Sequence, residues 1–374
     1  MTEPSPRLDI GILGGGQLGR MLALSGYPLG YAFHVLDPKD RVSASKVCHH
    51  IQADYDDPEA LDELRDVADV ITYEFENVPE AALERVDERP IFPPKRALEV
   101  SDDRLVEKKF FHDLDIGTVD IHPVASEEDL ADAVDKLGLP LVLKTRTMGY
   151  DGKGQARVEQ RAQVSDAWEA VGEVPSIAEG FADFDRELSV LGVRARDGTK
   201  RIYPVVENIH HEGILVESRA PATFDAASTC DEARSYSRRL LDELDYVGTL
   251  ALELFDTGDE LLANEMAPRV HNSGHWTIEG AETSQFENHV RAVAGVPLSG
   301  TDAVGHTRMI NVIGEHPDRQ PLLDQPGAHV HDYEKSPRPG RKIGHVTVRA
   351  DTAEQADGYA DQIRPVIEAA RDLG

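Results

Sequence analysis

The chain has 374 residues, enough for two or three domains with their own cores. Acids outnumber bases by 69 to 39, and a surface with a net charge of −30 repels nucleic acid and anionic membranes, which argues against both as partners. No apolar stretch is long enough to span a membrane, and the N-terminus lacks the regions of a signal peptide. With only two, distant cysteines, these features predict a cytoplasmic protein without a disulfide framework.

The acidic residues are spread along the chain rather than gathered in a tail. Repulsion between so many like charges is tolerated best in concentrated salt, where the Debye length falls to about 3 Å at 1 M. The composition therefore predicts a halophilic source.

The N-terminal segment has the pattern of a nucleotide-binding fold. A buried strand over 8–13 leads into a glycine turn with Gly14, Gly16 and Gly19, and a second strand over 32–37 ends in an acid. This spacing fits a dinucleotide site, but the same turn could place backbone amides at the phosphate of a mononucleotide. With a further strand over 70–76 and a helix over 79–86, it predicts a parallel sheet with helices on both faces.

The middle of the chain continues this α/β character. A helix over 103–114 leads into a small α/β unit, in which we expect a strand over 139–144, a helix over 165–171 and a strand over 175–181. Strands and helices then alternate as far as a helix over 285–294. A smaller last piece holds strands over 309–313 and 344–348 and a helix over 353–371.

Two acids stand out among apolar residues in this middle region. Glu253 lies in an alternating apolar strand over 250–255, and Glu265 lies in a second strand after a turn at 257–259. The pattern predicts a hairpin that holds both carboxylates, which are costly to bury unless a cation compensates them. A divalent ion that bridges nucleotide phosphates would use such a pair, with Asn272 nearby. Strand acids paired with arginines are the equally favoured alternative.

Two further stretches are typical of anion binding. Lys144 ends a buried strand and is followed by a glycine-rich loop up to Gln155, which suits a flap over a polyphosphate; a flexible surface hairpin is the alternative. Residues 335–345 hold four cations within eight positions, and two prolines and a glycine predict a fixed loop there. A general electrostatic patch is the alternative.

Taken together, the motifs resemble the ATP-grasp superfamily and, within it, the 5-(carboxyamino)imidazole ribonucleotide synthases of purine biosynthesis. The resemblance covers nearly the whole chain and rests on five segments, which are residues 14–21, 72–79, 144–155, 267–277 and 338–342. It implies a Rossmann-like preATP-grasp domain over 1–100 and an ATP-grasp region over 101–298, with a flap at about 118–179. A C-terminal domain over 299–374 completes the implied α/β fold.

The resemblance also implies roles for single residues. Glu253 and Glu265 are implied as ligands of magnesium, or of manganese in its place, together with Asn272. The residues implied to bind ATP are Arg104, Lys144, Gly149, Tyr150, Asp151, Gly152, Lys153, Gly154, Gln155, Glu179, Gly180, Phe181, Ala182, Glu187, His210, Asn264 and Glu265. The residues implied to bind aminoimidazole ribonucleotide are Gly16, Gln17, Leu18, Glu76, Tyr150, Asp151, His271, Asn272, Lys335, Arg341 and Lys342.

The implied reaction is ATP-dependent carboxylation of the ribonucleotide by bicarbonate through carboxyphosphate, with Asp151, Arg269 and Lys342 as catalytic residues. Asp151 is the candidate base and Arg269 the candidate bicarbonate ligand. A homodimer is expected from the resemblance alone. Another ATP-grasp ligase, such as a formate-dependent transformylase, and a nucleotide sensor without turnover are the alternatives. A dinucleotide oxidoreductase is disfavoured because nothing downstream of the glycine turn supplies hydride chemistry.

Overall fold

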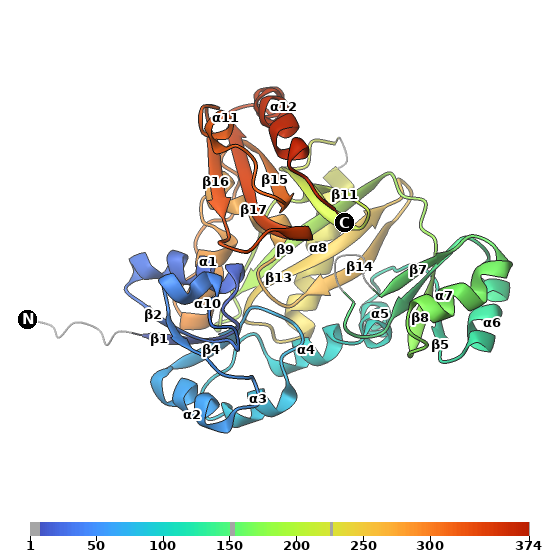
Figure 1. Ribbon diagram of the computed structural model, residues 1–374, viewed down its shortest axis with the longest axis horizontal. Helices are drawn as coiled ribbons and strands as arrows, with labels where there is room; N and C mark the ends of the chain where they lie inside the picture. Colours follow the sequence, from blue (N-terminus) through green and yellow to red (C-terminus); the bar gives the residue numbers. More distant parts are fainter. Residues whose placement is uncertain (1–7, 150–153, 225–226, 374) are drawn as a thin grey trace, which may run out of the picture.

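The computed structural model describes residues 8–149, 154–224 and 227–373. The chain forms an N-terminal lobe (β1 to α4), a small lobe (β5 to β8), a large lobe (β9 to α10, joined by α5) and a C-terminal lobe (β15 to α12) (Figure 1). In Figure 1 the blue N-terminal lobe and the red C-terminal lobe lie on one side of the large lobe, and the green small lobe lies on the other.

The N-terminal lobe is built on a parallel sheet with the strand order β3-β2-β1-β4. Its strands are β1 (Asp9–Leu13), β2 (Ala32–Leu36), β3 (His49–Ile51) and β4 (Val70–Tyr73). Its helices are α1 (Gln17–Gly26), α2 (Pro58–Val67), α3 (Glu80–Arg85) and α4 (Lys95–Ser101). Helices α1 and α2 belong to separate apolar clusters that cover opposite faces of the sheet, as the sequence predicts. Strand β4 stops short of residue 76 because its partner β1 ends at Leu13.

The small lobe has its own antiparallel sheet, in the order β5-β8-β6-β7. Its elements are β5 (Ile121–Val124), α6 (Glu127–Leu137), β6 (Leu141–Thr145), β7 (Gln155–Val158), α7 (Val164–Ala170) and β8 (Ser176–Gly180). Leu141, Leu143 and Val158 turn inward from the strands and pack with residues of both helices in one core. Helix α5 (Arg104–Asp113) precedes this lobe and is capped by Asp103, whose carboxylate accepts from the amide of Leu105 at 2.9 Å.

The large and C-terminal lobes share one antiparallel sheet, in which β10 pairs with β9 beside the order β14-β13-β9-β11-β12-β15-β17-β16. The strands of the large lobe are β9 (Arg186–Arg194), β10 (Lys200–Ile202), β11 (Val206–His211), β12 (Ile214–Ala220), β13 (Gly248–Asp256) and β14 (Leu261–Ala267). Helix α8 (Ala227–Glu243) covers one face of this sheet. Helix α10 (Gln285–Ala294) packs against β13 and β9 and also against α1, so it joins this sheet to the N-terminal lobe.

The C-terminal lobe corrects one prediction. It contains β15 (His306–Gly314), α11 (Arg319–Leu323), β16 (Ala328–Asp332), β17 (Arg338–Ala350) and α12 (Ala353–Ala369). The prediction of a fixed loop over 335–345 is wrong from Arg338 onward, because β17 already pairs with β15 there. Two register shifts between Val312 and Gly314 and a left-handed Gly340, with φ of 70°, let this strand accommodate Pro339.

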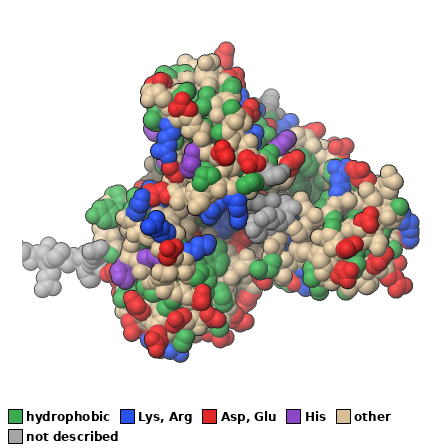
Figure 2. Space-filling model, viewed as in Figure 1, with side chains coloured by type: hydrophobic (Ala, Val, Ile, Leu, Met, Phe, Trp, Pro, Cys, Tyr) green, Lys and Arg blue, Asp and Glu red, His purple; other side chains and the backbone are tan. Residues whose placement is uncertain are grey.

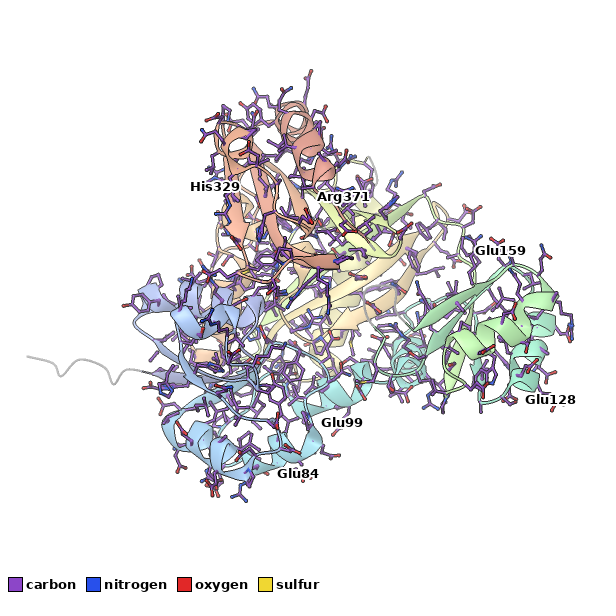
Figure 3. The ribbon with its side chains drawn as sticks, viewed as in Figure 1. Glu84, Glu99, Glu128, Glu159, His329 and Arg371 are labelled. Atoms are coloured by element: carbon purple, nitrogen blue, oxygen red, sulfur yellow. The ribbon has the colours of Figure 1, made fainter. Side chains whose placement is uncertain are left out.

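The acidic residues of the chain lie mainly on its periphery. Figure 2 shows Asp and Glu side chains scattered over all the lobes on the face in view. Four exposed acids, Glu84, Glu99, Glu128 and Glu159, lie along the outer edge of the molecule (Figure 3). Among the described residues, no helix is long and apolar enough to cross a membrane.

Candidate active site

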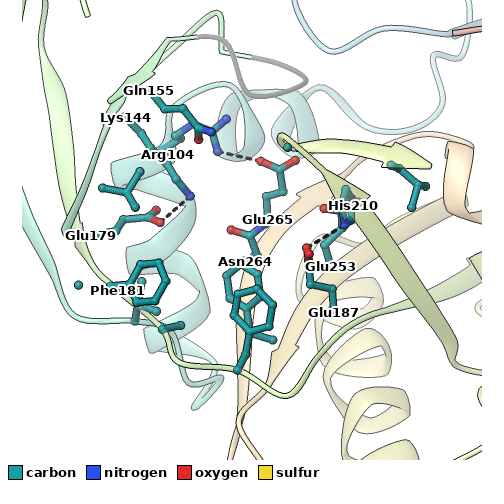
Figure 4. A pocket seen from close by; sticks show the side chains of 18 of the residues that line it. Arg104, Lys144, Gln155, Glu179, Phe181, Glu187, His210, Glu253, Asn264 and Glu265 are labelled. Atoms are coloured by element: carbon teal, nitrogen blue, oxygen red, sulfur yellow. Dashed lines mark hydrogen bonds and ion pairs between the residues drawn. The ribbon is translucent and has the colours of Figure 1, made fainter. Parts of the chain in front are cut away.

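Two adjoining cavities open where the lobes meet. The smaller, of about 410 Å³, lies between the small lobe and the hairpin of β13 and β14; the larger, of about 820 Å³, reaches the N-terminal and C-terminal lobes. Figure 2 shows Lys and Arg side chains gathered around the hollow between the lobes, and Figure 4 shows the smaller cavity. Five charged or titratable residues line both cavities, and these are Arg104, Glu253, Glu265, His271 and Lys342.

The predicted hairpin, which carries the acids Glu253 and Glu265, lies where the two cavities meet. Glu253 of β13 pairs with Glu265 of β14 across the antiparallel ladder, next to a register shift. Burial and the charge of Glu265 raise the pKa of Glu253 to about 7. Burial also acts on Glu265, but Arg104, whose Nη1 lies 2.8 Å from Glu265 Oε2, and Lys144 keep its pKa below the usual value. The pair therefore carries excess negative charge that a bound cation would offset.

His271 and Asn272 follow the hairpin and face the same junction. His271 Nε2 lies 3.5 Å from Glu253 Oε1, and burial and the charge of Arg269 lower the pKa of this histidine well below its usual value. The side chains of Asn272 and Asn311 exchange two hydrogen bonds, of 3.0 and 2.7 Å. The predicted metal ligand Asn272 is thus oriented by Asn311, and its oxygen already accepts one bond.

The donor set suits a cation that takes most of its ligands from elsewhere. Within the described part of the chain, no group of three or more His, Cys, Asp or Glu side chains is arranged to hold a metal ion. A carboxylate pair with one amide oxygen matches magnesium, which usually keeps waters and binds substrate phosphates beside one or two carboxylates. The residues present therefore fit the predicted ion.

The wall of the smaller cavity includes an aromatic stack that the sequence analysis missed. The rings of Phe184 and Phe255 lie 4.6 Å apart and are nearly parallel, at 12°. Phe181, a predicted ATP ligand, lines the same cavity and contacts Arg157. Flat apolar walls of this kind suit a planar base. Phe255 lies in the alternating strand β13 and Phe184 in the linker between β8 and β9. Alternation around Phe255 does not distinguish a cavity wall from a core.

A buried ion-pair group lies beside this cavity. Glu179 lies 2.6 Å from Lys144 Nζ (Figure 4). It also lies 3.4 Å from Lys108 Nζ. Burial would raise the pKa of Glu179, but the two lysines outweigh it and lower the pKa to about 2. The predicted ATP ligands Lys144 and Glu179 are therefore paired with each other. Across the cavity Glu187 and His210, also predicted ligands, form an ion pair of 2.9 Å.

The backbone amides of the glycine turn in the N-terminal lobe donate hydrogen bonds to acidic side chains of the protein itself. The amides of Gly16 and Gly19 donate to the carboxylate of Glu74, at 2.6 Å for Gly19, and the amide of Gly15 donates to Asp37 at 3.0 Å. The amides that the sequence offered as a possible phosphate site therefore already have carboxylate partners. Gly16 itself lines neither cavity, whereas the next two predicted residues, Gln17 and Leu18, line the larger one.

The far wall of the larger cavity is cationic. It includes Lys335, Arg338, Arg341 and Lys342, which come from the middle of the 333–337 loop and the start of β17. Burial lowers the pKa of Lys335 to about 8, although the nearby Glu74 opposes that shift. An isolated cluster of positive charge in an acidic protein suits an anionic ligand group.

Arg269 and Glu76, predicted for different ligands, lie together in the larger cavity. The Nη2 of Arg269 is 2.9 Å from Glu76 Oε1, and its Nη1 donates to the carbonyl of Val270 at 3.1 Å. Burial raises the pKa of Glu76, while Arg269 opposes that shift. The two predictions therefore converge on one ion pair at the cavity wall.

Part of the predicted flap lies outside the described residues, namely Tyr150, Asp151, Gly152 and Lys153. On either side of that gap, Gly149 lines the larger cavity and Gln155 the smaller one. Gly154 lines neither, and its carbonyl accepts from the amide of Thr145 at 2.8 Å. The other predicted residues of the smaller cavity, Gly180, Ala182 and Asn264, all line it.

Comparison with known proteins identifies the class of protein. Family models match in chain order: a ribonucleotide synthetase preATP-grasp domain over residues 8–102, an ATP-grasp domain over 109–286, and a phosphoribosylaminoimidazole carboxylase C-terminal domain over 307–358. The fold and the paired cavities thus define an ATP-grasp protein. This confirms the predicted fold class.

Relatives along the whole chain narrow this to one family. The N5-carboxyaminoimidazole ribonucleotide synthase of Pseudomonas aeruginosa is 47% identical over 97% of this chain and 100% of its own length. The enzyme of that name from Bacillus subtilis is 40% identical over 91% of both chains. The chain belongs to the N5-carboxyaminoimidazole ribonucleotide synthase family, and the predicted enzyme class, an ATP-grasp ligase, is confirmed.

Solved structures agree with this assignment. The N5-carboxyaminoimidazole ribonucleotide synthetase of Thermus thermophilus superposes with a TM-score of 0.91 at 49% identity, over 96% of this chain and 98% of that one. The Aspergillus clavatus enzyme, solved in complex with ADP and 5-aminoimidazole ribonucleotide, gives a TM-score of 0.91 at 32% identity, over 97% of this chain and 99% of that one.

Proposed function

We propose that the chain uses ATP and bicarbonate to convert 5-aminoimidazole ribonucleotide into 5-(carboxyamino)imidazole ribonucleotide. Family membership supports this reaction. The observation that carries it is the meeting of two cavities at Glu253 and Glu265, one lined by aromatic rings and the other by cations. This arrangement would bring a nucleotide and a second phosphorylated substrate to opposite sides of one carboxylate pair.

ATP would occupy the smaller cavity. Its base would lie against Phe184 and Phe255, and Glu187 would accept from the ribose hydroxyls. Arg104 and Lys144 would face the phosphates from the opposite wall (Figure 4). Both cations already have carboxylate partners, so the phosphates would share them with Glu265 and Glu179 rather than meet free charges.

Glu253 and Glu265, with Asn272, would hold magnesium, or manganese in its place. When bound, this ion would neutralise charge on the phosphates and help to align the transferring group. Glu253 would gain from such a partner, because burial and the charge of Glu265 raise its pKa to about 7 although His210 and Lys342 oppose that shift.

Bicarbonate would lie beside Arg269, between the two cavities. One of its oxygens attacks the γ-phosphorus, ADP leaves, and carboxyphosphate forms. The 5-amino nitrogen of the ribonucleotide then attacks the carboxyl carbon, inorganic phosphate is released, and the nitrogen loses a proton. Asp151 remains our candidate for the acceptor of that proton, and Lys342, which lines both cavities, is placed to stabilise the anions.

Aminoimidazole ribonucleotide would occupy the larger cavity. Lys335, Arg341 and Lys342 would contact its 5′-phosphate at one wall. Gln17, Leu18 and Glu76, at the other wall, would contact the sugar and base. His271 would border the junction of the two substrates, where its depressed pKa keeps the ring neutral.

One assay tests the proposal. ADP and phosphate release are measured with ATP, magnesium and bicarbonate, with and without aminoimidazole ribonucleotide, and carboxylation is followed with ¹⁴C-bicarbonate. We expect label in the ribonucleotide and ADP formation that depends on it. Turnover that needs formate instead, or no ribonucleotide-dependent turnover, would reject the proposal.

The surface charge supports a second proposal, that the protein works in concentrated salt, as in a halophile. A net charge of −30 gives strong self-repulsion at low ionic strength. We also propose that the chain acts in the cytoplasm as a homodimer. Light scattering tests the dimer, and a monomer at micromolar concentration would reject it.

A further inference from the structure

Gln285, the first residue of α10, is fully buried and bonds to the backbone of the segment that carries the site. Its Oε1 accepts from the amide of His271 at 2.9 Å, and its Nε2 donates to the carbonyl of His271 at 2.6 Å. The same Nε2 also lies 3.2 Å from Nδ1 of His275. One side chain thus bonds both backbone groups of a residue that borders both cavities.

Two further contacts tie this segment to the start of α10. Thr277 Oγ1 accepts from the amide of Gln285 at 2.9 Å and donates to the carbonyl of Gly274 at 2.6 Å. Gly274 itself packs on the Gln285 side chain, since a Cβ there would lie 2.7 Å from Gln285 Cδ and 2.3 Å from Leu191. Residues 271–277 are therefore held at several points against one helix end.

The held segment and the residues just before it include predicted ligands of bicarbonate, of the ribonucleotide and of the metal ion. Asn272 directly follows His271, the residue that Gln285 binds, and Arg269 lies two residues before it. The His271 ring lies 3.5 Å from Glu253. Past β14 these residues have no strand partner, because the ladder with β13 ends at Ala267. Gln285 takes the place of that partner for His271.

We propose that Gln285 is a positioning residue for the carboxylation reaction, acting through the backbone of His271 to set the positions of Arg269, His271 and Asn272. This inference rests on the proposed function for its kinetic consequence. Gln285 lines neither cavity and would touch no substrate. Displacement of reacting groups by as little as 1 Å can cost about 100-fold in rate.

The chain offers a matched control three residues along the same helix. Asn288 is also fully buried, and its amide bonds both backbone groups of Ser299, with the Ser299 amide at 2.9 Å and its carbonyl at 3.5 Å. Its Nδ2 also donates to the hydroxyl of Tyr203 at 2.9 Å. Neither Ser299 nor Tyr203 lines the two cavities. The variants Q285M and N288L each replace a bridging amide by an apolar side chain of similar size.

The test compares kcat, the KM of each substrate, the Kd of ADP and the melting temperature for both variants. The melting temperature should fall by a similar amount in both variants, because each substitution leaves two buried backbone groups without a hydrogen-bond partner. Q285M should lose at least about tenfold in kcat. N288L should stay within about twofold of the unsubstituted protein, and ADP affinity should stay within about twofold in both. A purely structural role for Gln285 would give equal kcat losses in the two variants, and that result would overturn the inference.

A second measurement separates this inference from the proposed function. Crystal structures of Q285M and N288L should show residues 269–275 displaced only in Q285M, with the β13–β14 hairpin unchanged in both. An undisplaced segment in Q285M would overturn the inference whether or not the enzyme carboxylates its substrate. Absence of ribonucleotide-dependent turnover in the unsubstituted protein would instead reject the proposed function alone.

Discussion

The amide of Gly19 donates to the carboxylate of Glu74 at 2.6 Å, so the first turn of α1 binds an anion that belongs to the protein. A glycine turn at a helix N-terminus is otherwise a general site for phosphate. Here the carboxylate satisfies the helix end, and in the proposed function the phosphate is bound instead by the cationic residues 335–342. The turn therefore has a structural role, although its sequence has the spacing of a nucleotide-binding motif.

Replacing Glu74 with Gln tests that role. The neutral amide can accept only weaker hydrogen bonds from Gly16 and Gly19, so the free energy of unfolding should fall by about 1–3 kcal/mol. Urea denaturation measures this change, with Glu84→Gln at the exposed rim as the control (Figure 3). Equal urea midpoints for the two variants would contradict the structural role of Glu74.

The pKa of Lys335 predicts a pH dependence of substrate capture. Burial lowers the pKa of this lysine to about 8, so it is positively charged below that pH and loses its charge above it. If Lys335 contacts the ribonucleotide phosphate, kcat/KM for the ribonucleotide should fall as pH rises from 8 to 9.5, with kcat less affected. In Lys335→Arg the fall should disappear, because arginine keeps its charge. A profile that is the same in both proteins would argue against this contact.

The aromatic stack predicts a loss of nucleotide affinity on substitution. Replacing Phe255 with Ala removes one of two stacked rings, and the Kd of ADP should rise by about tenfold. Isothermal titration calorimetry measures the Kd. The KM of the ribonucleotide should hardly change, because Phe255 lines only the smaller cavity. An unaltered Kd would place the base elsewhere.

Salt should stabilise the protein if its acidic surface is an adaptation. The melting temperature should rise steadily from 0.1 to 3 M KCl, because the Debye length falls from about 10 Å to below 3 Å over that range. Replacing the peripheral acids Glu84, Glu99, Glu128 and Glu159 by Gln should raise stability most at low salt. Equal melting temperatures at both salt concentrations would rule out this adaptation.

The features that the sequence predicted best depend on local patterns. Apolar alternation around Glu253 and Glu265 identified the hairpin, and helical periodicity gave α10 its observed bounds of 285–294. Local patterns cannot predict contacts between residues that are far apart in the sequence. Glu74 meets Gly19 across 55 positions of sequence, and Phe184, in the linker before β9, stacks on Phe255 of β13. At Arg338 the local signal was misleading, because Pro339 and Gly340 favour a loop until pairing with β15 overrides them.

One continuous sheet links Glu253 on β13 to Lys342 on β17 through hydrogen-bonded neighbours. The small lobe, by contrast, has a sheet of its own. Any motion that admits ATP can therefore be confined to the small lobe. The strands between them set the distance from the carboxylate pair to the cationic strand, so the two halves of the site are built on one rigid element.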